Sequence, residues 1–351
     1  MTRRVLLLGS DETLLLRAFQ SAATKARVWC LVPEGSAAAG ALRRSRRCAG
    51  VIEAPVVDGS FDRGAVEAAI EGAGATHLAP VAIDDAALVG TGDGWPCRTY
   101  PGVAADVRDR LHDKWCLAAL LAEAGVAAPP TDLVADAGEA RVAAAAHAFE
   151  VVVKPPAEAG GRGVFVCHGE ADVDAALAAS RWPCLVQRFV PGIDRDVSVL
   201  ARDGRVLAAA VQDRYLTHGL RFVDDPAALA AATAVVEASG FSGLAHLDMR
   251  RRPDGGIEVI ECNPRMYATM HLAAVAGVEL VSLGLDAADG WTPARPVVAR
   301  AGVVVPPRGL KAGWRHRATY TAATFRAAAG ALTDPRFAIS RGAAADWGAA
   351  R

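Results

Sequence analysis

The sequence predicts an α/β N-terminal domain with a parallel sheet, followed by an α+β domain made of two subdomains. Three features of the 351-residue chain support this prediction. Short apolar runs alternate with alanine-rich helical stretches through residues 5–81, as is typical of βαβ units. Residues 90–102 contain four glycines and two prolines and resemble a linker. From residue 151 onward, closely spaced apolar strands and hairpins replace the alternation.

The N-terminal stretch is expected to form a small parallel sheet. We expect helices after Asp11, after Ser36 and around residues 62–71, between strands at 5–8, 28–32, 51–52 and 76–81. Because a helical stretch joins consecutive strands, the strands should be parallel. A dinucleotide-binding fingerprint needs two further glycines after Gly9, but Asp11 and Leu14 occupy those positions. Nicotinamide binding is therefore not expected.

The rest of the chain divides into three further segments. A helix over residues 109–124 should end before Gly125 and the pair Pro129 and Pro130. Later strands are expected at 151–154, 163–167, 184–189, 197–201, 206–211, 244–250 and 257–262. The predicted domains are an N-terminal α/β domain (1–105), a linker helix with a small subdomain (106–190), a large subdomain (191–300) and an Arg-rich C-terminal extension (301–351).

Composition argues against several classes of protein. Lys and Arg total 38 against 39 for Asp and Glu, so the net charge of −1 provides no field that attracts nucleic acid or a membrane surface. No apolar run approaches the length of a spanning helix, and Asp11 follows the start too soon for a signal peptide. The seven cysteines are scattered, without a CxxC pair that would indicate zinc. We therefore expect a cytoplasmic globular protein with no nucleic-acid or membrane partner.

Lysine and asparagine are scarce. The chain has four lysines, Lys25, Lys114, Lys154 and Lys311, so the other 38 − 4 = 34 basic residues are arginines. Asn263 is the single asparagine. A lysine retained against this bias is a candidate for a site that needs a compact ammonium charge, which a guanidinium does not imitate.

Lys154 ends an apolar strand and precedes a glycine-rich loop that contains Gly160, Gly161, Arg162 and Gly163. Such glycines let backbone N–H groups turn toward an anion, and a lysine supplies the charge that phosphate oxygens require. The alternative is a flexible hairpin loop with a solvated lysine. The segment is not a Walker A motif, because the lysine precedes the glycines.

Residues 244–265 predict a β-hairpin that brings two carboxylates together. If Asp254 and Gly255 form a two-residue turn, Asp248 lies opposite Glu261 and His246 lies opposite Asn263 on one face. The other face should be buried, with Ala245, Leu247 and Met249 against Ile260 and Cys262.

Opposed carboxylates repel unless a cation or a proton lies between them. Oxygen ligands from Asp248, Glu261 and the Asn263 amide suit Mg²⁺, which also prefers to share its shell with phosphate. The alternative is a solvated strand pair whose carboxylates are neutralised by Arg250 or Arg265. The sequence favours the metal site.

The order of these segments resembles the ATP-grasp superfamily, the fold of biotin carboxylase and D-alanine:D-alanine ligase. The resemblance extends from about Asp113 to Gly284, and it includes Asp113 and Lys114 at a helix start and a strand that ends on Gln187. It implies that the βαβ start is the N-terminal domain of that superfamily.

The resemblance also implies a role for each candidate residue. Lys114 and Lys154 would contact the nucleotide phosphates, beneath a flap formed by the glycine-rich loop. Gln187 would face the adenine amino group, while the backbones of Arg188 and Val190 contact the base edge. Asp196, in preference to Asp194, would contact the ribose. The metal ligands would be Asp248, Glu261 and Asn263, and the catalytic residues Lys154 and Arg265, the latter facing the acyl phosphate.

The implied activity is that of an ATP-dependent ligase. It would activate a substrate carboxylate as an acyl phosphate, release ADP and join the acyl group to an amine. ATP and Mg²⁺ are the expected cofactors, with Mn²⁺ as an alternative metal, the substrates would be small molecules, and the assembly could be a homodimer. Thr269 replaces a glutamate that biotin carboxylase has, which argues against bicarbonate chemistry. The remaining alternatives are a thiol or hydroxyl acceptor and a non-catalytic ATP-binding scaffold.

Overall fold

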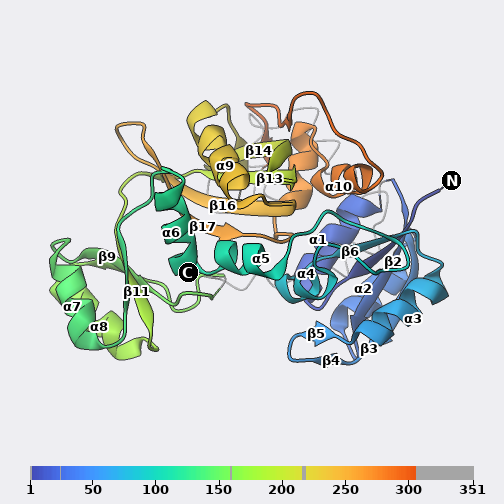
Figure 1. Cartoon of the computed structure of the whole chain (residues 1–351), viewed down its shortest axis with the longest axis horizontal. Helices are drawn as coiled ribbons and strands as arrows, with labels where there is room; N and C mark the ends of the chain where they lie inside the picture. The colour runs from blue at the N-terminus through green and yellow to red at the C-terminus, as the bar shows by residue number, and fades with distance from the viewer. Residues whose placement is uncertain (1, 24, 159, 216–218, 306–351) are drawn as a thin grey trace, which may run out of the picture.

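The computed structural model describes residues 2–23, 25–158, 160–215 and 219–305. The predicted C-terminal extension lies mostly outside these residues. Figure 1 shows the small subdomain, with α7 and α8, at one end of the molecule and the N-terminal domain at the other. Strands β13, β14, β16 and β17 of the large subdomain lie between them. The predicted fold class is confirmed.

The N-terminal domain contains a five-stranded sheet in the order β3-β2-β1-β6-β7, and all its pairs are parallel. The strands are β1 (Arg4–Leu8), β2 (Arg27–Pro33), β3 (Cys48–Ala54), β6 (His77–Pro80) and β7 (Arg98–Thr99), with a β4–β5 hairpin (Val56–Val57, Ser60–Phe61). The helices are α1 (Glu12–Ala22), α2 (Ala37–Arg44), α3 (Arg63–Ala73) and α4 (Ile83–Val89). Asp11, Ser36 and Asp62 cap three of the helices through their side chains, as the sequence indicates.

The small subdomain is a four-stranded antiparallel sheet in the order β10-β9-β11-β8. Its elements are β8 (Thr131–Val134), α7 (Ala137–Ala145), β9 (Glu150–Lys154), β10 (Phe165–His168), α8 (Glu170–Ala179) and β11 (Cys184–Arg188). Alternate residues such as Val151, Val153 and Val186 pack against α7 and α8. The opposite face carries Lys154 and Gln187, whose side chains are also buried.

The large subdomain is built on an eight-stranded sheet, in which β16 lies between β13 and β17. Its strands are β12 (Ile193–Asp194), β13 (Asp196–Arg202), β14 (Arg205–Tyr215), β15 (Gly219–Phe222), β16 (Gly243–Arg251), β17 (Ile257–Asn263), β18 (Val297–Val298) and β19 (Val304–Val305). One face packs against α9 (Pro226–Ser239) through side chains such as Val197 and Leu247. The other face, at one end, joins a core with η1 (Met270–Ala276), α10 (Leu280–Ala288) and the N-terminal domain.

The predicted helix over residues 109–124 is wrong in one respect, since it is two helices, α5 (Ala105–His112) and α6 (Lys114–Glu123). Asp113 breaks it with an extended backbone (φ −74°, ψ 121°), and its carboxylate accepts hydrogen bonds from the N–H groups of Trp115 and Cys116. An aspartate satisfies these N–H groups better as an N-cap than inside a helix. Leu111 and Leu117 pack both helices against the large sheet, although they lie in segment 106–190.

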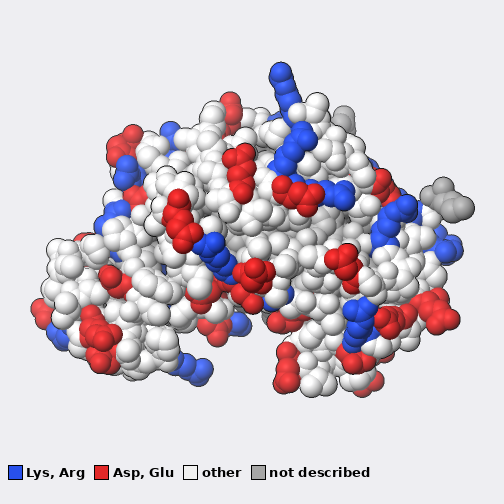
Figure 2. All heavy atoms as spheres, viewed as in Figure 1, with Lys and Arg blue, Asp and Glu red and all other residues white. Residues whose placement is uncertain are grey.

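Figure 2 shows acidic and basic side chains mixed over the visible face, and a hollow between the small subdomain and the N-terminal domain. Among the described residues, no single helix is long and apolar enough to cross a membrane, and the apolar pair η1 and α10 is bent by 96°.

Candidate active site

The hairpin of β16 and β17 brings together the two predicted carboxylates. Asp248 pairs with Glu261 and His246 pairs with Asn263, as the sequence predicts. The predicted two-residue turn is wrong, because Arg252 closes a longer loop with Gly256. A β-bulge after Asp248 absorbs the extra residue and preserves the register at the site.

Because of the bulge, one residue of the predicted buried face is wrong. Met249 pairs with Val259, which is 1% exposed, whereas Ile260 lies at the bulge and is only partly buried. Ala245, Leu247, Met249 and Cys262 are buried as expected.

A third carboxylate joins the pair. Ser198 on β13 pairs with His246, so the same register places Asp196 next to Asp248 on this face. The ligand atoms of Asp196, His246 and Asp248 all lie within 4.8 Å of one another. Asp194, by contrast, is ion-paired to Arg250 at 2.6 Å and to Arg214 at 3.0 Å. Of the two aspartates considered for the ribose contact, Asp196 is thus the one that faces the site.

Asp196, Asp248 and Glu261 form a row of carboxylates, and two of them have a raised pKa. Burial and the charge of Asp248 raise the pKa of Asp196 to about 7 and also raise the pKa of Glu261. Burial acts to raise the pKa of Asp248 too, but the neighbouring His246 lowers it overall. The site therefore concentrates negative charge at a cost, which fits a divalent cation held by Asp248 and Glu261.

Asn263 contacts the row through its amide nitrogen. Its Nδ2 donates to Asp248 Oδ2 at 3.1 Å, and its Oδ1 accepts from Arg265 Nη2 at 3.1 Å. The predicted metal-binding oxygen of Asn263 therefore faces Arg265. Arg265 also donates to the Met266 carbonyl, and burial lowers its pKa. The alternative in which Arg250 neutralises the opposed carboxylates is wrong, because its guanidinium pairs with Asp194.

Both predicted lysines are buried and face Glu261 from different elements. Lys114, at the start of α6, lies 3.6 Å from Glu261 Oε2 and donates to the Glu158 carbonyl at 2.7 Å. Lys154, at the end of β9, has its pKa lowered to about 8 by burial, although the charge of Glu261 acts in the opposite direction. Each lysine is 3% exposed.

The glycine-rich loop begins directly after Lys154. Gly160, Gly161 and Gly163 adopt φ values of 70°, 73° and 67°, in the left-handed region that favours glycine. Arg162 pairs with Glu158 at 2.9 Å, and the same residue accepts the hydrogen bond from Lys114. One of the two predicted phosphate-binding lysines thus contacts the segment that leads into the predicted flap.

The edge of β11 supports the predicted adenine contact. The Arg188 N–H donates to the Pro130 carbonyl at 2.9 Å, but a proline has no N–H with which to return a hydrogen bond. The Arg188 carbonyl therefore lacks that partner and can accept from an amino group. The Val190 carbonyl accepts from Arg250. The Gln187 side chain is engaged at both ends, since Oε1 accepts from Lys154 and Nε2 donates to Thr131.

Sequence reasoning did not assign a role to His246. The ring stacks on Tyr267 at 4.5 Å, and Nδ1 lies 3.0 Å from the Ser198 hydroxyl. It was placed on the correct face by the hairpin register, but its proximity to Asp196 depends on a strand pairing that the hairpin does not specify.

Comparison with known proteins finds related sequences. Residues 180–307 match a family model described as ATP-grasp in the biosynthetic pathway with Ter operon. The large chain of carbamoyl phosphate synthase from Xylella fastidiosa is 27% identical over 217 residues, which cover 54% of this chain and 20% of that protein. The chain thus spans about a fifth of the length of this relative.

Solved structures share the fold over most of the chain. Biotin carboxylase from Campylobacter jejuni superposes with a TM-score of 0.65 at 17% identity, covering 84% of this chain and 72% of that one. L-amino acid ligase from Bacillus licheniformis gives 0.60 at 14% identity, covering 82% and 74%. These solved structures show that the chain has the fold of biotin carboxylase and L-amino acid ligase, and the family model identifies an ATP-grasp match over residues 180–307.

Proposed function

We propose that the protein is an ATP-dependent ligase that phosphorylates a substrate carboxylate with release of ADP and then joins the acyl group to an amine with release of phosphate. The observation that carries this proposal is the convergence of Lys114 and Lys154 on the Asp248–Glu261 pair. Two buried cations beside opposed carboxylates suit a phosphate chain with its metal, because buried charges need partners of opposite sign.

ATP would lie between the small and large subdomains. The edge of β11 at Arg188 and Val190 would contact the adenine, and Asp196 is the proposed ribose contact. Lys154 and Lys114 would donate to phosphate oxygens and offset the charge that develops on the transferred phosphoryl group. The loop with Gly160, Gly161 and Gly163 would cover the phosphates and exclude water, which would otherwise hydrolyse the acyl phosphate.

Asp248 and Glu261 would hold the metal, for which we propose Mg²⁺, with Mn²⁺ as an alternative. Asn263 would join them if its amide turned its oxygen away from Arg265. Bound there, the metal would neutralise charge on the phosphate oxygens. Arg265 would hold the acyl phosphate, since its guanidinium donates to an amide and a carbonyl oxygen and contacts no carboxylate directly among the described residues.

The comparisons support ligation as the class of reaction. The name L-amino acid ligase refers to the joining of amino acids, and the name carbamoyl phosphate synthase refers to a nitrogen-containing product. The proposed substrates are a small carboxylic acid and a small amine. A homodimer is the assembly we would test first by measuring the molar mass in solution.

The test crosses a panel of carboxylic acids with amines and identifies the nucleotide released. Hydroxylamine should replace the amine, giving a hydroxamate together with ADP. Asp248→Asn should abolish turnover, whereas Asp254→Asn, in the hairpin loop away from the site, should retain it. Release of AMP and pyrophosphate would refute the acyl-phosphate mechanism. Products formed with thiols or alcohols but not with amines would show that the acceptor is not an amine.

A further inference from the structure

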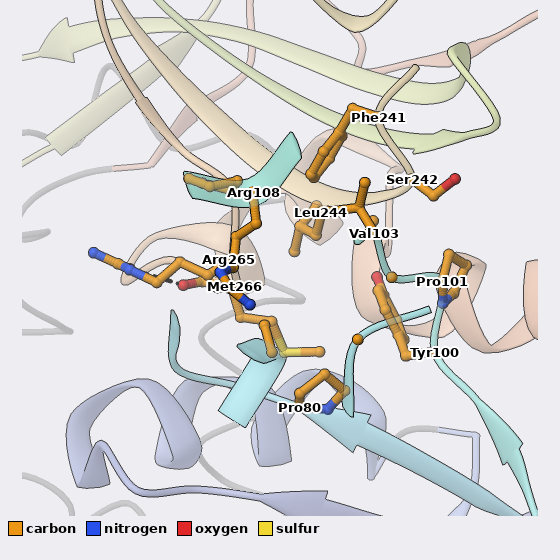
Figure 3. Close-up of a pocket in the computed structure, with 15 residues that line it drawn as sticks. Pro80, Tyr100, Pro101, Val103, Arg108, Phe241, Ser242, Leu244, Arg265 and Met266 are labelled. Carbon is orange, nitrogen blue, oxygen red and sulfur yellow. Dashed lines mark hydrogen bonds between the residues drawn. The ribbon is translucent and has the colours of Figure 1, made fainter. Parts of the chain in front are cut away.

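A small cavity lies at the junction of the N-terminal domain and the large subdomain. Its volume is about 30 Å³, and its lining comes from α4, the stretch 100–103, α5, the start of β16 and residues 264–266 (Figure 3). Residues 264–266 directly follow Asn263, so the cavity borders the candidate active site.

Most of this lining is apolar, and among the buried side-chain N and O atoms that line it in the described residues, one lacks a hydrogen-bond partner. Tyr100 Oη donates to the Leu280 carbonyl at 3.1 Å, and Ser242 Oγ is 3.4 Å from Asp203. Arg108, which is 8% exposed, differs from them. Its Nε and Nη2 both donate to Asp109, but its Nη1 is buried without a hydrogen-bond partner among the described residues.

The unpartnered donor indicates a ligand. A buried guanidinium N–H that lacks an acceptor is costly, so such groups are nearly always paired in native proteins. Arg265 also lines the cavity, and its guanidinium is bonded only to an amide and a carbonyl oxygen in the described residues. Arg108 and Arg265 thus bring two guanidinium groups to this corner, and the Arg108 N–H that lacks a partner among the described residues favours an anionic acceptor.

We propose that the cavity receives a carboxylate group of a substrate, bound by Arg108 Nη1. A cavity of about 30 Å³ is roughly twice what one water molecule needs, so it accommodates a group of a few heavy atoms and not a whole substrate. A planar guanidinium is the side chain best matched to a carboxylate. Phe241, Leu244 and Met266 would surround the carbon chain next to it.

This carboxylate would anchor the substrate and would not react. The inference here rests on the proposed function, in which the reacting carboxylate lies near the phosphates and the Asp248–Glu261 pair. One substrate therefore carries a carboxylate in addition to its reacting group. It is either an amino acid that supplies the amine or a dicarboxylic acid that is phosphorylated at its far end.

The experiment compares matched probes that differ only in the anchoring group. Binding of L-amino acids and their amides, and of succinate and succinamate, would be measured by calorimetry in the presence of Mg²⁺ and a non-hydrolysable ATP analogue. The parent should bind the carboxylate member of one pair at least about tenfold more tightly, as expected for a hydrogen bond to a charged group. The pair that shows this preference identifies the source of the carboxylate.

Variants then assign the preference to Arg108. Arg108→Gln should remove it, and Arg108→Lys should keep part of it. Arg110→Gln is the matched control, because Arg110 lies on the same helix but pairs with Glu123 at the surface. Nucleotide binding should be unchanged in all three.

The outcomes separate this inference from the proposed function. If no probe pair shows a preference in the parent, or if Arg108→Gln retains it, the carboxylate cavity is wrong, whatever the nucleotide products are. If the preference follows Arg108 but turnover gives AMP, the cavity stands and the proposed chemistry fails. If Arg108→Gln does not fold, Arg108→Lys still decides. Lysine keeps the charge but not the planar guanidinium, so a preference for the carboxylate probe that is unchanged or absent in this variant contradicts the proposal.

Discussion

Lys154 donates a hydrogen bond from its ammonium group to the side-chain oxygen of Gln187 at 2.8 Å, and both side chains are buried. The partner is a neutral amide, so it satisfies the donor without balancing the charge. Burial consequently lowers the pKa of Lys154 to about 8. The Lys154 ammonium group is therefore expected to lose its proton at a pH only slightly above neutral.

ATP affinity should therefore fall as the pH rises through about 8, because the neutral amine no longer attracts phosphate. Below pH 8, the buried charge lowers the free energy of unfolding by a constant amount. Between pH 8 and the ordinary lysine pKa, the unfolded chain binds the proton more tightly, so this penalty is relieved as the pH rises. Nucleotide titrations from pH 6.5 to about 9.5 would measure the midpoint, and Lys154→Met should bind weakly without this pH dependence.

Replacing Gln187 by glutamate should move that midpoint upward. A carboxylate at 2.8 Å from the ammonium favours its protonated form, so ATP affinity should persist to a higher pH. Thr131→Val is the control, because it removes the hydrogen bond from Gln187 Nε2 without adding charge. An unchanged midpoint in Gln187→Glu would show that Lys154 does not set the pH dependence.

The scarcity of lysine leads to a second comparison. Lys154→Arg should weaken ATP binding or turnover by about tenfold or more, because a guanidinium has a different shape and Lys154 has little room around it. Lys25→Arg, at an exposed position, should change neither quantity, and Lys311→Arg, outside the described residues, is a further control. Similar small effects at every lysine would make the scarcity a matter of composition alone.

The hairpin shows why part of the site was predictable from the sequence. Asp248 and Glu261 are 13 positions apart in one hairpin, and the alternation of buried residues specifies which side chains share a face. The predicted turn was wrong by one residue. The error changed the assignment of Val259 and Ile260 but not that of the carboxylates, because the bulge lies between the turn and the Asp248–Glu261 pair.

The position of Asp196 was not predictable in the same way. Its neighbour Asp248 follows 52 residues later, and their proximity depends on the pairing of β13 with β16. Nothing local in the sequence specifies that pairing, and the same holds for the approach of Lys114 to Glu261. The family resemblance supplied the assignment of Lys114 to the site. The preference of aspartate for N-cap positions explains the break at Asp113, but the prediction of one helix over residues 109–124 missed it.

Two glycine positions test the packing between domains. Gly284 in α10 faces Tyr100, and an added Cβ would lie 2.0 Å from the ring. Gly284→Ala should destabilise the protein by about 1–3 kcal/mol, as overpacking does in a tight core. Gly72→Ala in α3, where nothing lies within 4 Å, should instead stabilise it by about 0.5–1 kcal/mol. Denaturant unfolding would measure both, and equal effects would contradict the packing at Tyr100.

The last prediction concerns Glu261, which has competing neighbours. Asp248 repels its carboxylate and Lys114 attracts it at 3.6 Å, while burial also opposes the charge. The pKa of Glu261 is raised, so repulsion and burial outweigh the attraction. A raised pKa in the folded state means that the ionised carboxylate lowers stability at neutral pH. Glu261→Gln should therefore leave the metal-free protein no less stable, or more stable by a few tenths of a kcal/mol.

The same substitution should abolish magnesium-dependent turnover, because it removes an anionic ligand. Glu258→Gln provides the contrast on the same strand, since Arg188 and Arg252 hold that carboxylate at 2.6 and 2.9 Å. It should cost about 1–3 kcal/mol of stability and leave the magnesium requirement unchanged. Thermal unfolding in chelator and ATP turnover against magnesium concentration would measure both effects. A Glu261→Gln variant that loses stability and keeps its turnover would mean that Glu261 serves as the ion-pair partner of Lys114 and not as a metal ligand.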